Sequence, residues 1–84
     1  MLASADNMKL QITNVERSVS EEELKKLFEA YGQVSECTIV LDKTTGKSKG
    51  FGFVTMDHEP SAREAVAGLN GRVVNEMKIK VKRL

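Results

Sequence analysis

Aromatic residues are scarce in this chain of 84 residues. Tryptophan is absent, and the aromatic residues are Phe28, Tyr31, Phe51 and Phe53. Phe51 and Phe53 stand two residues apart, a spacing that puts both rings on one face of a β-strand. Because a small domain with few aromatics is expected to bury them, the direction of these two rings is the main question that the sequence raises.

Cysteine and histidine each occur once, as Cys37 and His58. One cysteine excludes an intramolecular disulfide and is typical of a reducing compartment. The chain lacks the clustered spacing of metal ligands, so we expect no metal site and no cofactor. No nucleophile is spaced to partner His58, and we predict that the protein is not an enzyme.

Long apolar runs are also absent, the longest being three residues such as Ile39-Val40-Leu41. We therefore expect no membrane-spanning segment. Thirteen basic and twelve acidic residues give a net charge of +1, which by itself indicates no nucleic-acid partner. Residues 1–7 lack the features of a signal peptide and are predicted to be a flexible tail, with one domain over residues 8–84.

Hydrophobic periodicity and helix-end residues predict six elements. Polar-apolar alternation or β-forming residues mark strands at 9–13, 34–41, 49–56 and 78–82. A capping box of Ser20 and Glu23 begins one helix, and Pro60 stands near the start of another. The order β-α-β-β-α-β predicts an α+β, ferredoxin-like sandwich: a four-stranded antiparallel sheet with the first and third strands central and both helices on one face.

The other face of that sheet has nothing in the sequence to cover it. Placing most of the apolar residues of each strand toward the helices leaves the following residues on the open face: Lys9, Gln11, Thr13, Thr38, Val40, Lys78, Lys80 and Lys82. In the third strand, either Phe51 and Phe53 or the alternate set of Gly52, Val54 and Met56 is buried. A shift of one residue exchanges the two sets, so periodicity leaves both arrangements open.

Two segments resemble the RNA recognition motif family. KGFGFVTM (residues 49–56) is similar to the family's octamer, basic-Gly-aromatic-Gly/Ala-aromatic-Val-x-aromatic, except that Met56 replaces the last aromatic. LQITNV (residues 10–15) resembles the family's hexamer, except that Gln11 stands where an aromatic is usual. The resemblance covers about Met8 to Arg83. If the chain is a complete natural protein, it resembles the small single-domain RNA-binding proteins of bacteria.

The resemblance implies that both rings lie on the open face and that the chain binds single-stranded RNA, or single-stranded DNA, as a monomer. By analogy Phe53 stacks on a base, Phe51 packs against bases or sugars, and Lys49 meets a phosphate. Gln11 either reads a base edge or is simply solvated. The remaining expected contacts are hydrogen bonds from Thr13 and Thr38 and attraction of phosphates by Lys9, Lys47, Lys78 and Lys80.

Three points stay open in the sequence. Lysines on exposed strands also prevent edge-to-edge pairing, and for Lys78 and Lys82 alone this interpretation is favoured over phosphate binding. A protein-interaction domain on the same fold is the alternative function. We expect the cytoplasm, or the nucleus if the chain is a domain of a larger eukaryotic protein.

Overall fold

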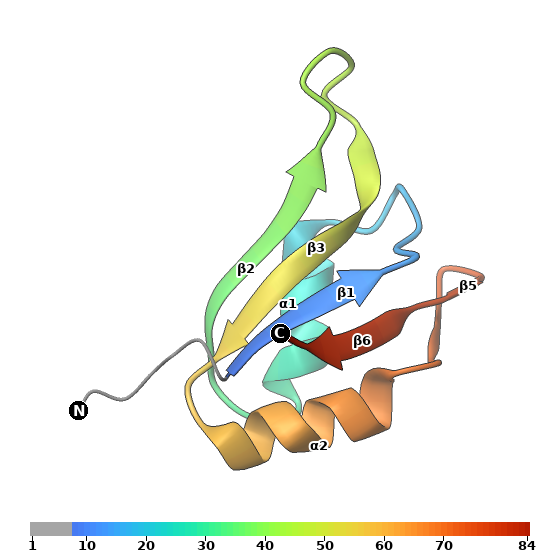
Figure 1. Cartoon of the computed structure of the whole chain (residues 1–84). Helices are drawn as coiled ribbons and strands as arrows, with labels where there is room; N and C mark the ends of the chain where they lie inside the picture. Colours follow the sequence, from blue (N-terminus) through green and yellow to red (C-terminus); the bar gives the residue numbers. More distant parts are fainter. Residues whose placement is uncertain (1–7) are drawn as a thin grey trace.

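The computed structural model describes residues 8–84, and the predicted tail at residues 1–7 lies outside them. The elements follow in the order β1 (Lys9–Thr13), α1 (Glu21–Glu29), β2 (Val34–Leu41), β3 (Ser48–Met56), α2 (Glu59–Leu69), β4 (Val73–Val74), β5 (Met77–Lys78) and β6 (Lys80–Arg83). The main sheet has the antiparallel strand order β2-β3-β1-β6, and β4 pairs only with β5. Figure 1 shows this sheet in front of α1, with α2 beneath it. The predicted ferredoxin-like sandwich is confirmed, with β1 and β3 at its centre.

Helix α1 begins at the predicted capping box. The Ser20 hydroxyl accepts a hydrogen bond from the Glu23 backbone N–H at 3.1 Å, and the Glu23 carboxylate accepts one from the Ser20 N–H at 3.0 Å. These bonds satisfy backbone donors that have no partner within the helix. The helix then buries Leu24 and Phe28 against the sheet.

Helix α2 begins with Pro60 in its first turn and buries Ala62, Ala65 and Leu69. Its small residue Gly68 leaves room for the Tyr31 side chain, which follows the end of α1. A Cβ atom at Gly68 would lie 2.2 Å from the Tyr31 hydroxyl, so the Tyr31 ring occupies the space that a larger residue would need.

The core lies between the helices and one face of the sheet. Its strand residues are Leu10, Ile12, Val34, Ile39, Val54, Met56 and Val81, all buried. The predicted inward direction of the apolar residues is therefore correct in the first, second and last strands, and in β3, where periodicity left two arrangements open, Val54 and Met56 point inward. Cys37 also points inward but remains half-buried, packed against the edge of the core.

The prediction of one last strand over residues 78–82 is wrong at the first two of these residues. Lys78 belongs to β5 and pairs with Val73, and the sheet strand β6 begins only at Lys80. Between them, the backbone of Ile79 bonds to Arg72 and Gly71 instead of to β1. Because the Ile79 side chain is nevertheless fully buried, the polar-apolar alternation continues through the break and conceals it.

Candidate nucleic-acid interface

Both phenylalanines of β3 lie on the sheet face that the helices leave uncovered. On the opposite face, Val54 and Met56 are fully buried, which excludes the arrangement with buried rings. Phe51 and Phe53 are half-buried, and their ring centroids lie 6.2 Å apart in an edge-to-face arrangement. We call this side of the sheet the open face. It consists of Lys9, Gln11, Thr13, Glu36, Thr38, Phe51, Phe53, Thr55, Lys80 and Lys82.

The strand register arranges the open face in rows across the sheet. Thr38, Phe53, Gln11 and Lys82 form one row, each opposite the next on the neighbouring strand. Neighbouring residues in such a row lie roughly 4.5–5.5 Å apart. The Gln11 amide therefore stands directly beside Phe53, where it can reach the edge of a base stacked on that ring.

A second row contains Phe51, Thr13 and Lys80. Lys80 and Lys82 thus occupy the β6 edge of both rows. The register confirms that Lys9, Gln11, Thr13, Thr38 and Lys80 lie on the open face, and it places Lys82 opposite Gln11. The sequence does not show that Lys82 stands next to Gln11, because its neighbours across the sheet depend on which strand it pairs with.

The octamer glycines shape the strand that carries the rings. Gly50 has φ +88°, a left-handed conformation that favours glycine, and it lies where two pairings of β3 with β2 are separated by an irregularity. A Cβ atom at Gly52 would lie 2.3 Å from the Thr38 carbonyl oxygen. The second glycine is therefore required by the close approach of the β2 backbone, next to the Phe53–Thr38 pair.

Charge on the open face is uneven. Lys9 places its ammonium 5.2 Å from the Phe53 ring centroid, in cation-π contact, and Lys80 and Lys82 add positive charge at the β6 edge. Glu36 stands opposite Thr55 on β2 and is the acidic member of this face. A polyanion is therefore attracted most strongly to the β1–β6 half of the sheet.

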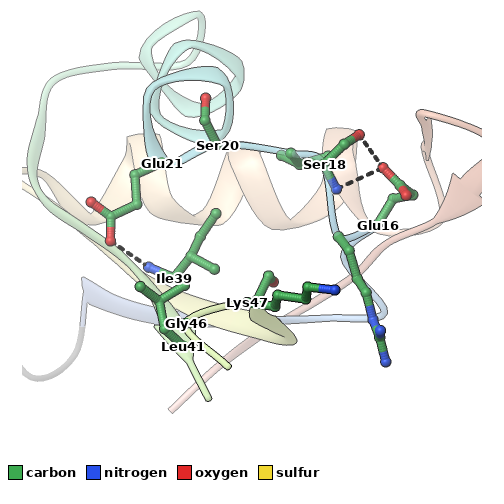
Figure 2. Close-up of a pocket in the computed structure, with 11 residues that line it drawn as sticks. Glu16, Ser18, Ser20, Glu21, Ile39, Leu41, Gly46 and Lys47 are labelled. Atoms are coloured by element: carbon green, nitrogen blue, oxygen red, sulfur yellow. Dashed lines mark hydrogen bonds between the residues drawn. The ribbon is translucent and has the colours of Figure 1, made fainter. Parts of the chain in front are cut away.

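Two predicted lysines lie away from the open face. Lys78 is on β5, outside the main sheet. Lys47 lines a hollow of about 720 Å³ between the β1–α1 loop, the start of α1 and the β2–β3 loop, as Figure 2 shows. The hollow lies on the helix side of β2, because the buried Ile39 contributes to its lining. Lys49 is exposed and lines a surface hollow together with Phe51.

The carboxylates in this hollow already have structural partners. Glu21 accepts a hydrogen bond from the Ile39 N–H at 2.9 Å, and Glu16 accepts from the N–H and the hydroxyl of Ser18 (Figure 2). The bonds from Ser18 hold the pKa of Glu16 below its ordinary value. Both side chains therefore have a structural role: Glu16 orders the β1–α1 loop, and Glu21 joins the start of α1 to β2.

The thiol of Cys37 is in a position that disfavours its reactive thiolate form. Burial, followed by the nearby Glu21 carboxylate, raises the pKa of Cys37 to about 11. Its Sγ lies 3.4 Å from the Glu21 carbonyl oxygen, as a donor to it. Within residues 8–84, no cluster of three or more His, Cys, Asp and Glu side chains could hold a metal ion, and no helix there is long and apolar enough to cross a membrane.

The fold and the two motif strands agree with a family match. The model of the RNA recognition motif matches residues 10–80. The chain belongs to the RNA recognition motif family. The hexamer begins in β1 and the octamer lies in β3. These two strands pair with each other in the centre of the sheet.

Curated relatives and solved structures support this assignment. The human poly(U)-binding splicing factor PUF60 is 36% identical over 62 residues, which make up 74% of this chain and 11% of PUF60. The chain thus spans about a tenth of the length of the curated relatives it matches. The RNA-binding protein PG1 has a TM-score of 0.89 and 36% identity, over 92% of this chain and 93% of PG1.

Sex-lethal from Drosophila melanogaster is a further structural relative. Its RNA recognition domains 1 and 2 match with a TM-score of 0.87 and 32% identity, covering 92% of this chain and 49% of that one. A complex of Sex-lethal with RNA has a TM-score of 0.89. PUF60 and Sex-lethal are eukaryotic proteins, so these comparisons give no support to the expected similarity to small bacterial proteins.

Proposed function

We propose that this domain binds a short stretch of single-stranded RNA on the open face, as a monomer and without a catalytic step. The observation that carries the proposal is the position of Phe51 and Phe53 on the uncovered side of the sheet. The chain has few aromatic residues, and these two are not used to fill its core. Each base stacked on a ring contributes about 1–3 kcal/mol, and unpaired bases are what single-stranded RNA offers.

The lysines favour a nucleic acid over a protein partner. Lys9, Lys80 and Lys82 border the rings, and the exposed Lys49 adjoins Phe51, so phosphates on either side of a stacked base meet positive charge. In this arrangement Phe53 stacks on a base, Phe51 packs against the neighbouring sugar or base, and Gln11 with Thr38 bonds to base edges. Thr13 lies beside Phe51 and contacts the next nucleotide.

The relatives support RNA as the nucleic acid. Sex-lethal has been solved with RNA, and PUF60 is named for binding poly(U). Stacking alone does not distinguish RNA from DNA, and the distinction rests on contacts to the 2′-hydroxyl. A location in a reducing compartment, the nucleus or the cytoplasm, is part of the proposal; the single cysteine and the splicing-factor name of PUF60 support it.

An amide-shift titration with uridine oligonucleotides tests the proposal. We expect the largest shifts in β1 and β3, and a roughly 5- to 150-fold weaker affinity for Phe53→Ala, which corresponds to the loss of about 1–3 kcal/mol of stacking. Leu41→Ala is the matched control, since Leu41 is an apolar side chain, 54% exposed, in the hollow on the helix side. Shifts confined to the helices, or equal affinities of Phe53→Ala and Leu41→Ala, would contradict the proposed site.

A further inference from the structure

The hairpin of β4 and β5 is held in a fixed position beside the end of β1. Asn75 and Glu76 form its turn with φ of 51° and 74°, the conformation of a tight two-residue hairpin loop. The Asn14 side-chain amide donates to the Lys78 carbonyl at 2.7 Å, and the Asn75 amide donates to the Ser18 hydroxyl at 3.2 Å. These two bonds anchor the hairpin to the β1–α1 loop. Figure 1 shows the hairpin near the end of β1.

This anchoring creates a groove between the hairpin and the open face. The groove has a volume of about 560 Å³, within the range of roughly 300–1,000 Å³ that small-ligand sites occupy. Met77 lines it from the hairpin, with 37% of its surface exposed, and Phe51 lines it from β3. We call this space the hairpin groove.

The hairpin groove is continuous with the proposed RNA-binding surface. Phe51 and Thr13 line the groove and are also neighbours in the second row of the open face. A strand lying across Phe53 and Phe51 therefore reaches the groove without leaving the protein surface.

The charges of the groove suit a phosphate. Arg17 and Lys49 line it and are exposed, against one carboxylate, Glu16. Glu16 is already bonded to Ser18, whereas arginine and lysine at a groove rim are the usual partners of phosphate oxygens. A second acid, Glu76, lies in the hairpin turn and lines the neighbouring hollow with Glu16 instead of the groove.

We propose that the hairpin groove binds one further nucleotide of the RNA strand, with its base against Met77 and the edge of Phe51 and its phosphate near Arg17 and Lys49. The inference rests on the proposed function and extends it. It also gives a physical role to a departure from the family pattern. Gln11 removes one stacking ring from the row of Phe53, and the apolar pair of Met77 and Phe51 supplies contact area for a base beyond the second row, at the Thr13 end of β1.

The test is a length series of oligouridylates from three to six nucleotides, with affinity measured for the parent, Met77→Ser and Arg17→Gln. We expect the parent to gain at least fivefold in affinity at one step of the series, where the added nucleotide enters the groove. Met77→Ser should lose that gain while keeping the parent's affinity for the shortest oligonucleotide. Arg17→Gln should reduce the gain and lower the magnitude of the salt slope by roughly 0.7 for the longer oligonucleotides.

Two matched controls separate the groove from its surroundings. Val73→Ser removes an apolar side chain that is 56% exposed on the same hairpin but does not line the groove. Arg72→Gln removes an exposed positive charge just before the hairpin. Both should keep the gain. If Met77→Ser keeps the gain in affinity with the added nucleotide, or if Val73→Ser loses that gain to the same extent, the inference is wrong.

Methyl resonances of methionine give a second, independent readout. The Met77 methyl should shift with the longer oligonucleotides and not with the shortest, while the fully buried Met56 methyl stays in place throughout. An unshifted Met77 methyl in the saturated complex overturns the inference. Failure of the proposed function is distinguishable, because Phe53→Ala would then bind the shortest oligonucleotide as well as the parent does.

Discussion

The ammonium group of Lys9 lies 5.2 Å from the centroid of the Phe53 ring, on the open face of the sheet. Lys9 therefore covers the ring on which a base is proposed to stack. An exposed cation-π contact contributes about 0.5–1 kcal/mol, less than the 1–3 kcal/mol of a stacked base. We infer that a base displaces the ammonium group, which then moves toward a phosphate.

Lys9→Met tests this exchange. At low salt the variant should bind RNA more weakly, and the magnitude of its salt slope should fall by roughly 0.7, because one phosphate contact is lost. At high salt, where the phosphate contact is screened, its affinity should equal or exceed that of the parent. Fluorescence anisotropy over a salt series measures both, with Lys26→Met on α1 as the control. A variant weaker than the parent at every salt concentration would show that Lys9 contributes by more than charge.

Glu36→Gln should strengthen RNA binding. Glu36 is the acidic residue of the open face, and a unit charge at 4 Å in water contributes about 1 kcal/mol, so we expect a rise in affinity of up to about fivefold at low salt. The rise should disappear at high salt. Glu22→Gln, in the first turn of α1, is the control and should change the affinity little. Equal effects of the two variants would show that only the net charge matters.

Gly52→Ala should damage the sheet more than Gly50→Ala. At Gly50 alanine must adopt φ +88°, which costs roughly 1–2 kcal/mol. At Gly52 the new Cβ atom would lie 2.3 Å from the Thr38 carbonyl oxygen, so β2 and β3 must separate. Urea denaturation should show the larger loss of unfolding free energy for Gly52→Ala. Amide exchange near Ile39, which pairs with Gly52, should accelerate in that variant only.

Ser20→Ala should lower the free energy of unfolding by about 1 kcal/mol, because it removes the acceptor that caps α1. Thr44→Ala, in the exposed β2–β3 loop, is the control and should lie within about 0.5 kcal/mol of the parent. Both values come from urea denaturation. RNA affinity should be unchanged in both, since neither residue belongs to the open face. A cap variant as stable as the parent would mean that Glu23 or solvent replaces the hydroxyl.

The Cys37 thiol should resist alkylation at neutral pH. Burial raises its pKa to about 11 from 9.0, so the reactive thiolate forms only at high pH. The rate of alkylation by iodoacetamide should rise with a midpoint near pH 11 in the folded protein and near 9 in urea. Because the folded pKa is the higher one, the thiol's contribution to stability is complete below pH 9 and is lost as the pH rises through 11. A folded-state midpoint near 9 would contradict the buried position.

The order of the main elements, the capped start of α1 and the inward apolar residues of the first, second and last strands could all be predicted from the sequence. These features follow from local chemistry: alternation in strands, an i, i+3, i+4 stripe in helices, and a serine-glutamate pair at a helix start. The same alternation misled at the last strand. Ile79 lies at the break between β5 and β6 and is buried, so the alternation of buried and exposed residues continues through the break. Only its backbone hydrogen bonds to Gly71 and Arg72 mark where β5 ends.

The tertiary structure decided which residues stand next to one another. The direction of Phe51 and Phe53 was undetermined by periodicity, because a shift of one residue exchanges the two faces, and the burial of Val54 and Met56 fixed it. The pairing of Gln11 with both Phe53 and Lys82, and the position of Met77 beside Phe51, join residues far apart in the chain. Such contacts depend on strand register and on one hairpin anchored by Asn14, which no local pattern records.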